Sequence, residues 1–318
     1  MAYGFDLTLF KDTDFVNQLH EMTTAFFAEG RTIDLIENQP GNKNKDSLNM
    51  FDNNITVQDG TGCGFTPEGD VALIQKYVEV VPLKVNDKLC YKDLEKTYMG
   101  MYMKASNEET KIPTWFQTRL AESYVTKVRR FNEIFLWNGN EDYDGLAKQI
   151  ADDANVIDAS AEVDGAQTKI AAVNAMIAKA TADILESDDL RMFCSLSFYT
   201  GYVQELLAAN LYIMPQTYNN GEPNKMEITI PGTNIILTPV LGLDHITNVT
   251  VDDGELLVLT YSKNLVASYD GLGEDERFDM IPNPYDGNNL YVTMEWKLGS
   301  AFKWADRIVK GYSVVSAS

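Results

Sequence analysis

The feature that most limits the possible folds of this chain is a run of strand-forming residues from Val71 to Val85, with charged side chains spaced among them. After the turn-forming pair Asn86-Asp87, the segment Lys96–Lys104 places methionines on one face and tyrosines on the other, a period of two that is typical of strands. Pairing of the two segments predicts an extended ribbon within residues 65–104. A two-stranded ribbon is marginally stable in water, because it cannot cover its own apolar faces. The ribbon therefore lies either inside an ordinary sheet or against another subunit.

If another subunit covers the ribbon, its apolar side chains are the expected contacts. Methionine suits a contact that repeats in slightly different geometries, because its unbranched thioether adapts to irregular gaps. The predicted inter-subunit contact residues are Val78, Val80, Leu83, Tyr98, Met99, Met101, Tyr102 and Met103.

The composition is typical of a folded protein that does not span a membrane. The chain has 318 residues, of which 45% are hydrophobic, enough for one large domain or for two to three smaller ones. No apolar run reaches the roughly 18 to 20 residues of a membrane span, and the first residues lack the pattern of a signal peptide. Cys63, Cys90 and Cys194 are too far apart for the paired spacing of a zinc or redox site. We expect a soluble, cytoplasmic chain with free thiols.

The charge is strongly acidic but unevenly distributed. The formal net charge is -21, whereas residues 65–137 carry 11 basic and 10 acidic side chains. An acidic protein is a poor general binder of nucleic acid, because phosphate neutralisation by lysine and arginine supplies most of the non-specific affinity. We hypothesise that a nearly neutral arm leaves an acidic body and lies on a neighbour without repulsion, whereas contact between two bodies is opposed at low salt.

The most regular helical pattern covers Ile112–Trp137. Its apolar residues form one stripe, Pro113 and Thr114 are typical of a helix start, and Asn138-Gly139 of a helix end. Such a helix is roughly 35 Å long, about the width of a small domain. The opposite face is basic, which is typical of a solvated surface but would also suit a polyanion. Its basic residues are Arg119, Lys127, Arg129 and Arg130.

The remaining segments predict an α+β protein rather than a parallel wound sheet. Apolar residues at helical spacing predict further helices over residues 14–29, 164–185 and 195–210. The polar stretch 37–54 is interpreted as a loop or an extended arm. The final third is rich in strands, with a turn at Pro231-Gly232 and one apolar face along Leu290–Leu298. Helices and antiparallel strands thus segregate along the chain.

No arrangement of residues predicts catalysis, a cofactor or a metal site. The two histidines, His20 and His245, have no evident orienting partner or nucleophile. Residues 140–151 match the first positions of a calcium loop, but Ala151 stands where a bidentate glutamate is required, so a capped turn is the preferred interpretation. The glycine-rich segment 59–65 fits neither the dinucleotide fingerprint nor the phosphate loop. We therefore predict a structural protein that is not an enzyme and needs no cofactor.

The order of these segments resembles the major capsid protein of tailed bacteriophages, with the Hong Kong 97-like fold that encapsulin shells share. In that family an extended loop lies over the adjacent subunit and a spine helix runs through the peripheral domain; Phe65–Lys104 and Ile112–Trp137 resemble them. The segment YDGLAKQI resembles the exit from the spine helix. AAVNAMIAKATADIL and YTGYVQELL resemble helices of the axial domain, and DGELLVLTYSKNLVASYDG with LYVTMEWKLGSAFKWADRIVKGY resembles the return through the peripheral domain.

The resemblance implies an α+β capsid fold with five parts. These are an N-terminal arm (1–60), an extended β-hairpin loop (61–110), a peripheral domain with the spine helix (111–165), an axial domain (166–250) and return strands of the peripheral domain (251–318).

The resemblance also implies a function. Hexamers and pentamers of the chain would form an icosahedral phage head, assembled in the host cytoplasm, that encloses double-stranded DNA without sequence-specific contacts. The basic residues of the long helix would then lie on the inner face. Separate scaffolding, portal and decoration proteins are further expected partners, and a membrane is not. Two alternatives stay open: an encapsulin-like compartment that holds an enzyme cargo, and an α+β enzyme or ligand-binding protein with a defined pocket.

Overall fold

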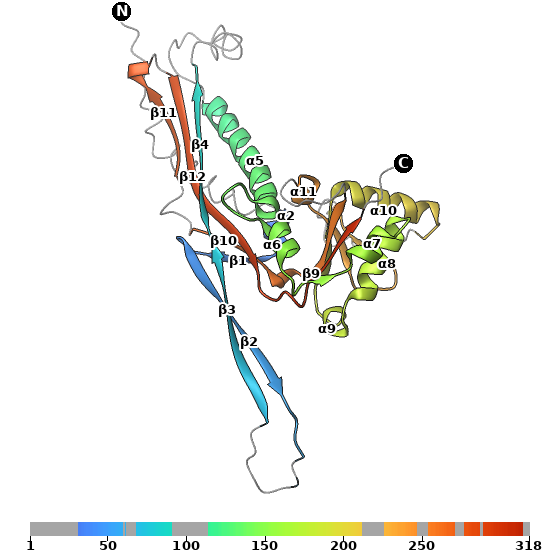
Figure 1. Ribbon diagram of the computed structural model, residues 1–318. Helices are drawn as coiled ribbons and strands as arrows, with labels where there is room; N and C mark the ends of the chain where they lie inside the picture. Colours follow the sequence, from blue (N-terminus) through green and yellow to red (C-terminus); the bar gives the residue numbers. More distant parts are fainter. Residues whose placement is uncertain are drawn as a thin grey trace, which may run out of the picture.

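The protein consists of two lobes and a long hairpin that projects away from them (Figure 1). One lobe is an elongated sheet with helix α5 along it, and the other combines a six-stranded sheet with short helices. The predicted helix over residues 14–29, which includes His20, lies outside the described residues. The computed structural model describes residues 31–59, 61, 68–90, 114–211, 226–246, 254–270, 277–286 and 289–313.

Strand β12 (Asn289–Phe302) organises the elongated sheet, because β4, β10 and β11 all pair with it in antiparallel fashion. Strand β1 completes the sheet by parallel pairing with β10. Alternate side chains from Leu290 to Leu298 are buried, which confirms the predicted apolar face of this strand. The other strands are β1 (Glu37–Pro40), β4 (Val81–Leu89), β10 (Leu265–Tyr269) and β11 (Arg277–Asn283).

Helix α5 (Thr114–Asn138) covers the elongated sheet and confirms the predicted long helix. Val128 and Phe135 of the predicted apolar stripe are buried in the core. Phe131 of the same stripe is exposed, although its ring stacks on Phe135 and meets the edge of Trp296. Among the stripe residues whose side chains the structure describes, burial is thus complete for Val128 and Phe135, partial for Leu120 and Tyr124, and absent for Phe131.

The six-stranded sheet of the second lobe is buried on both faces, and its order is β5-β13-β9-β6-β8-β7. In the central strand β9 (Glu255–Tyr261), Leu256 and Val258 belong to the core that includes α5, whereas Leu257 and Leu259 pack with α8 and α10. Burial on both faces explains the continuous apolar run of this strand. The other strands are β5 (Ile157–Asp158), β6 (Leu190–Cys194), β7 (Ile228–Thr229), β8 (Ile236–Pro239) and β13 (Val309–Ser313).

Short helices complete the molecule, and those over residues 164–185 and 195–210 confirm the predictions. Gly232, at φ +82°, lies in the predicted turn between β7 and β8. The α-helices are α2 (Arg31–Leu35), α6 (Leu146–Asp152), α7 (Ser160–Asp164), α8 (Lys169–Lys179), α9 (Ala182–Leu185), α10 (Leu196–Ala208) and α11 (Leu241–Asp244). Two 3-10 turns cover Ser262–Asn264 and Pro284–Asp286.

The strand pairings divide the end of the chain differently from the expected domains. The expected division places residues 251–318 together as return strands of one domain. In the structure β10, β11 and β12 belong to the elongated sheet, whereas β9 and β13 belong to the six-stranded sheet. Strand β9 takes a central position there because both of its faces are apolar, and a strand of that kind needs cover on both sides.

The hairpin differs from the predicted ribbon, because the run Val71–Val85 is divided between two strands, each of which pairs with another part of the chain. The observed hairpin pairs β2 (Lys45–Ile55) with β3 (Gly69–Glu79), after which the chain enters β4 and pairs with β12. Strand β2 falls in the stretch that is interpreted as a loop from sequence, because its aspartate and asparagine residues are unfavourable in strands. Residues 98–103 lie outside the described part of the chain, so the partner strand predicted there is not tested.

The base of the hairpin is fixed on the elongated sheet. Leu48 and Val78 form a small buried cluster with two residues of that sheet, Val266 and Ala301. Asn42 Nδ2 donates a hydrogen bond to the Val78 carbonyl oxygen at 3.1 Å. These contacts orient the hairpin before it leaves the body of the protein.

The crossing of the hairpin base over β12 requires a glycine. A Cβ added at Gly299 would lie 1.9 Å from the Glu79 carbonyl oxygen. We expect Gly299→Ala to lower the free energy of unfolding by about 1–3 kcal/mol, because two backbones must move apart. Urea unfolding measures the change. Gly165→Ala is the control, since its Cβ would meet neighbours at an ordinary 3.5 Å; an equal loss in both variants would contradict the close crossing.

Candidate subunit interface

The groups that could form a metal site or act in catalysis are described first, because the sequence predicts neither. Within the ranges that the structure describes, no three histidine, cysteine, aspartate or glutamate residues converge as metal ligands. No helix in those ranges has the length and apolar character for a membrane span. His245 is exposed. In the calcium-like loop, Asn140 Oδ1 accepts a hydrogen bond from Asp142 N, and Asp144 forms an ion pair with Lys148. Both contacts are typical of a turn that its own side chains cap.

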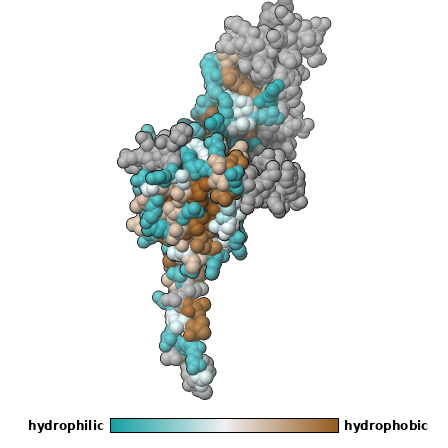
Figure 2. Space-filling model, turned by 90° about the vertical axis from the view of Figure 1, so that its right-hand side faces the viewer, coloured by the Kyte–Doolittle hydropathy of each residue, from teal (hydrophilic) through white to brown (hydrophobic). Residues whose placement is uncertain are grey.

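One face of the hairpin carries exposed apolar side chains, and polar residues such as Asn49 and Gln75 interrupt them. Phe51 lies directly opposite Leu73, so the two side chains share a face, and the alternate positions on either strand continue it. Figure 2 shows hydrophobic surface on the narrow hairpin. The exposed fractions are 69% for Phe51, 76% for Ile55, 67% for Val71, 64% for Leu73 and 52% for Tyr77. An apolar stripe of this kind is typical of a surface that another protein covers.

The hairpin is acidic rather than neutral, which corrects the charge hypothesis. From Lys45 to Glu79 the chain has two basic residues, Lys45 and Lys76, and six acidic ones: Asp46, Asp52, Asp59, Glu68, Asp70 and Glu79. The balanced count over residues 65–137 arises because that range combines part of the hairpin with the basic helix α5. The contact that the hairpin makes should therefore depend on ionic strength.

The predicted contact residues that the structure describes are not on the exposed face of the hairpin. Val78 and Val80 are buried within this chain, and Leu83 packs partly buried against its core. Burial within their own chain makes Val78 and Val80 poor contact candidates, whereas the partly buried Leu83 stays a prediction. Tyr98, Met99, Met101, Tyr102 and Met103 lie outside the described residues.

The predicted basic residues do lie along one helix. Arg119, Lys127 and Arg130 are exposed on α5, and Arg129 is half-buried. Two of them, Arg129 and Arg130, also line a cavity that sequence patterns do not reveal.

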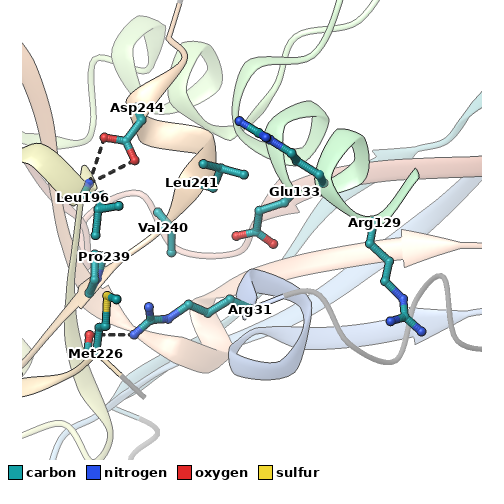
Figure 3. Close-up of a pocket in the computed structure, with 10 residues that line it drawn as sticks. Arg31, Arg129, Glu133, Leu196, Met226, Pro239, Val240, Leu241 and Asp244 are labelled. Carbon is teal, nitrogen blue, oxygen red and sulfur yellow. Dashed lines mark hydrogen bonds between the residues drawn. The ribbon is translucent and has the colours of Figure 1, made fainter. Parts of the chain in front are cut away.

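This cavity of about 300 Å³ lies between α5 and the second lobe (Figure 3). Its lining is both apolar and charged. The apolar residues are Leu196, Met226, Pro239, Val240 and Leu241. The charged residues are Arg31, Arg129, Arg130, Glu133 and Asp244. The Asp244 carboxylate accepts hydrogen bonds from the N–H groups of Leu196 and Ser197 at the start of α10.

A buried glutamate anchors α2 beside the cavity. Glu133 accepts hydrogen bonds from Thr32 N at 3.2 and 3.0 Å and from the Thr32 hydroxyl group. Trp137 Nε1 donates to the same hydroxyl oxygen at 2.9 Å. Burial raises the pKa of Glu133, and the hydrogen bonds from Thr32 oppose this change.

An arginine then connects α2 to the second lobe. Arg31 Nη2 donates to the Met226 carbonyl oxygen at 2.7 Å and lies 3.8 Å from Glu227. Glu227 is also paired with Arg191 of β6 at 3.2 Å. The walls of the cavity are thus held by polar contacts from both lobes.

Comparison with known proteins identifies the fold. No protein-family model matches the chain, and no curated protein matches its sequence. Solved structures do match over most of their length. A chain of the procapsid of satellite phage P4, whose structure includes the size determination (Sid) protein, has a TM-score of 0.56 at 11% identity, covering 94% of this chain and 90% of that one. This chain has the Hong Kong 97-like capsid fold.

Other structures with this fold come from different particles. The capsid structure of cyanophage P-SCSP1u matches with a TM-score of 0.52 at 12% identity, over 89% of this chain and 87% of that one. A virus-like particle from Pyrococcus furiosus matches with a TM-score of 0.50 at 10% identity, over 92% and 97%. Sequence identities of 10–12% establish the Hong Kong 97-like fold alone. The function must be argued from the exposed residues of this chain.

Thr32→Val tests the anchor between α2 and the spine of this Hong Kong 97-like chain. The substitution removes a hydroxyl group that serves both Glu133 and Trp137, so we expect a loss of about 1–3 kcal/mol of unfolding free energy at pH 7. Without this hydrogen bond the pKa of Glu133 rises further, and the folded state binds its proton more tightly.

The loss should therefore shrink as the pH falls toward 4, where the carboxyl group is protonated in both states. Denaturant unfolding at several pH values measures this trend. Thr126→Val is the matched control, because Thr126 is exposed on α5 and its hydroxyl group donates to the Glu122 carbonyl oxygen. A loss that is independent of pH would contradict the role assigned to the Thr32 hydroxyl group.

Proposed function

We propose that this chain is the major capsid protein of a tailed bacteriophage and assembles with copies of itself into the shell of the head. The observation that carries the proposal is the exposed apolar stripe of Phe51, Ile55, Val71, Leu73 and Tyr77 on a hairpin that projects from the body. A monomer would leave this stripe in water, whereas a neighbour in a shell would cover it.

The geometry of the hairpin favours a closed ring of subunits. Its base is fixed on the chain's own sheet, and strands β2 and β3 extend away from both lobes (Figure 1). Each copy would then give its hairpin to one neighbour and receive that of another. Contacts of this heterologous kind generate rings when the rotation closes, as in the hexamers and pentamers of an icosahedral shell.

We propose a division of the capsid protein into parts that differs from the expected ranges, and the strand pairings support it. The extended loop corresponds to β2 and β3, and the spine helix to α5. The elongated sheet with α5 corresponds to the peripheral domain, and the six-stranded sheet with α7 to α11 to the axial domain.

The proposed content of the shell is double-stranded DNA, held without sequence-specific contacts. A net charge of -21 keeps packed DNA from adhering to the wall through many phosphate contacts. Arg119 and Lys127, exposed on α5, are the proposed positions where the inner face meets phosphate groups. Separate scaffolding, portal and decoration proteins are proposed partners of this virion protein.

Electron microscopy and light scattering of the purified protein test the proposal across concentration and salt. We expect shells, rings or capsomers from the unaltered chain. Nucleic acid in the particles supports a phage head, whereas a protein cargo would favour the encapsulin-like alternative. A monomer at every concentration and salt, also with co-expressed scaffolding protein, would contradict the proposal.

A double substitution tests the role of the hairpin stripe. Phe51→Ser with Leu73→Ser should abolish assembly, because two opposed apolar contacts are lost, while thermal unfolding of the monomer stays unchanged since both side chains are exposed. Asn49→Ser with Gln75→Ser is the matched control: this pair lies on the same face and is polar. If the variant with both Phe51→Ser and Leu73→Ser forms normal shells, the stripe does not make the contact between subunits.

A further inference from the structure

The buried cluster at the base of the hairpin does not by itself fix the angle at which the hairpin leaves the body. Leu48 of β2 packs there on Val266 and Ala301, and these contacts are apolar. Apolar contacts are non-directional, so they hold the hairpin on the sheet but allow it to tilt. A fixed angle needs a directional contact in addition.

Lys76 makes a directional contact at the same level of the hairpin. It lies on β3, directly opposite Leu48. Its Nζ atom lies 4.0 Å from the centre of the Phe302 ring, at the end of β12, and 3.8 Å from Asp153 Oδ2. In the described part of β3, no residue farther from the base makes a polar or ring contact with the body.

We propose that Lys76 is a positioning residue that sets the angle of the hairpin, and thereby the rings of subunits that the hairpin can join. The inference rests on the proposed function, in which the hairpin contacts a neighbour in a ring. Lys76 acts on that contact from a distance, because Phe302 and Asp153 belong to its own chain. The rotation between neighbours decides which ring closes, and a hairpin held at one angle limits that rotation.

The carboxylate that pairs with Lys76 is itself held in place. Asp153 Oδ1 accepts hydrogen bonds from Asn155 N at 2.9 Å and from Asn155 Nδ2 at 3.1 Å, so the other oxygen is left for Lys76. Asp153 follows α6, in a segment that continues into β5 of the six-stranded sheet. Lys76 thus connects the hairpin both to the elongated sheet and to the segment that enters the second lobe.

Partial burial strengthens the contact. The side chain of Lys76 is 33% exposed and that of Asp153 is 23% exposed, so water and salt screen their attraction less than that of an open surface pair. Burial lowers the pKa of Lys76, and the negative charges of Asp153 and Asp306 oppose this change. An ammonium group over an aromatic ring gains more when it is partly desolvated. These surroundings favour one position of the ammonium group.

The distance between two spin labels measures the angle in the free subunit, below the concentration for assembly. Labels at Val57→Cys and Glu186→Cys, both exposed positions, report the far part of the hairpin and the second lobe. The chain also carries Cys63→Ser and Cys90→Ser, because Cys90 is exposed. Val57 lies about 30 Å beyond Leu48 at about 3.3 Å per residue, so a tilt of about 10° moves its label by about 5 Å.

Loss of the positive charge should let the hairpin tilt. Lys76→Met keeps most of the aliphatic chain, and we expect the width of the distance distribution to increase about twofold, as strand twist varies by tens of degrees when nothing fixes it. Lys76→Arg should keep a narrow distribution, because a guanidinium group also stacks on aromatic rings and pairs with carboxylates. Lys45→Met is the matched control: it removes the same charge, but Glu79 and Tyr77, the partners of Lys45, belong to the hairpin itself.

Electron microscopy of assembled particles tests the effect on rings. We expect Lys76→Met to form particles with a wider range of diameters than the unaltered chain, together with unclosed assemblies. The physical reason is that hairpins at several angles join neighbours at several rotations, and only some of these rotations close.

The outcomes separate this inference from the proposed function. Broader distances together with more varied diameters support it. An unchanged distribution in Lys76→Met, or equal broadening in Lys45→Met, overturns it and leaves the capsid proposal standing. Broader distances with unchanged diameters also overturn it, because neighbours would then set the angle in the shell. An unaltered chain that never assembles contradicts the capsid proposal and the choice of rings with it, whereas the distances still decide whether Lys76 sets the angle.

Discussion

The packing of α5 on β12 is the contact on which the rest of the molecule depends. Two buried hydrogen bonds fix it: Trp296 Nε1 donates to Asn132 Oδ1, and Ser300 Oγ donates to the Leu136 carbonyl oxygen, both at 3.0 Å. The C-terminal end of the same helix holds the second lobe, because Trp137 packs tightly on Gly242 of α11. One helix thus joins both sheets, and β12 in turn carries the base of the hairpin.

Regular periods made much of the fold predictable from the sequence. Helix α5 and strand β12 each repeat one pattern over many residues, so local spacing alone identifies them. Strand β2 was missed because its sequence, KDSLNMFDNNI, mixes polar and apolar residues without a strict period. Its two faces are used differently along its length: Leu48 is buried on the sheet near the base, whereas Phe51 on the other face is exposed near the tip. A strand that changes environment midway has no single period to detect.

The surface that we assign to assembly was only partly accessible to sequence reasoning. A ribbon that needs a neighbour stays a prediction, and the proposed contact residues are now Phe51 and its companions rather than Val78 and Val80, because only the pairing partner tells which face is covered. The cavity could not be found in this way. Its lining residues come from α2, α5, the start of α10, the segment before β7, and β8 with α11, and only tertiary structure brings these together.

Because the crossing at Gly299 fixes the base of the hairpin, a small rotation of the elongated sheet moves the far end of the hairpin by a larger distance. With 11 residues in β2 and about 3.3 Å per residue, the arm is roughly 35 Å long. A tilt of about 5° in the twist of the elongated sheet would then displace the tip by about 3 Å, which lies well within the variation in twist between neighbouring strands. A small adjustment inside one subunit could thus let the same arm reach neighbours at different angles, such as those of five-membered and six-membered rings, without any change in the contact itself.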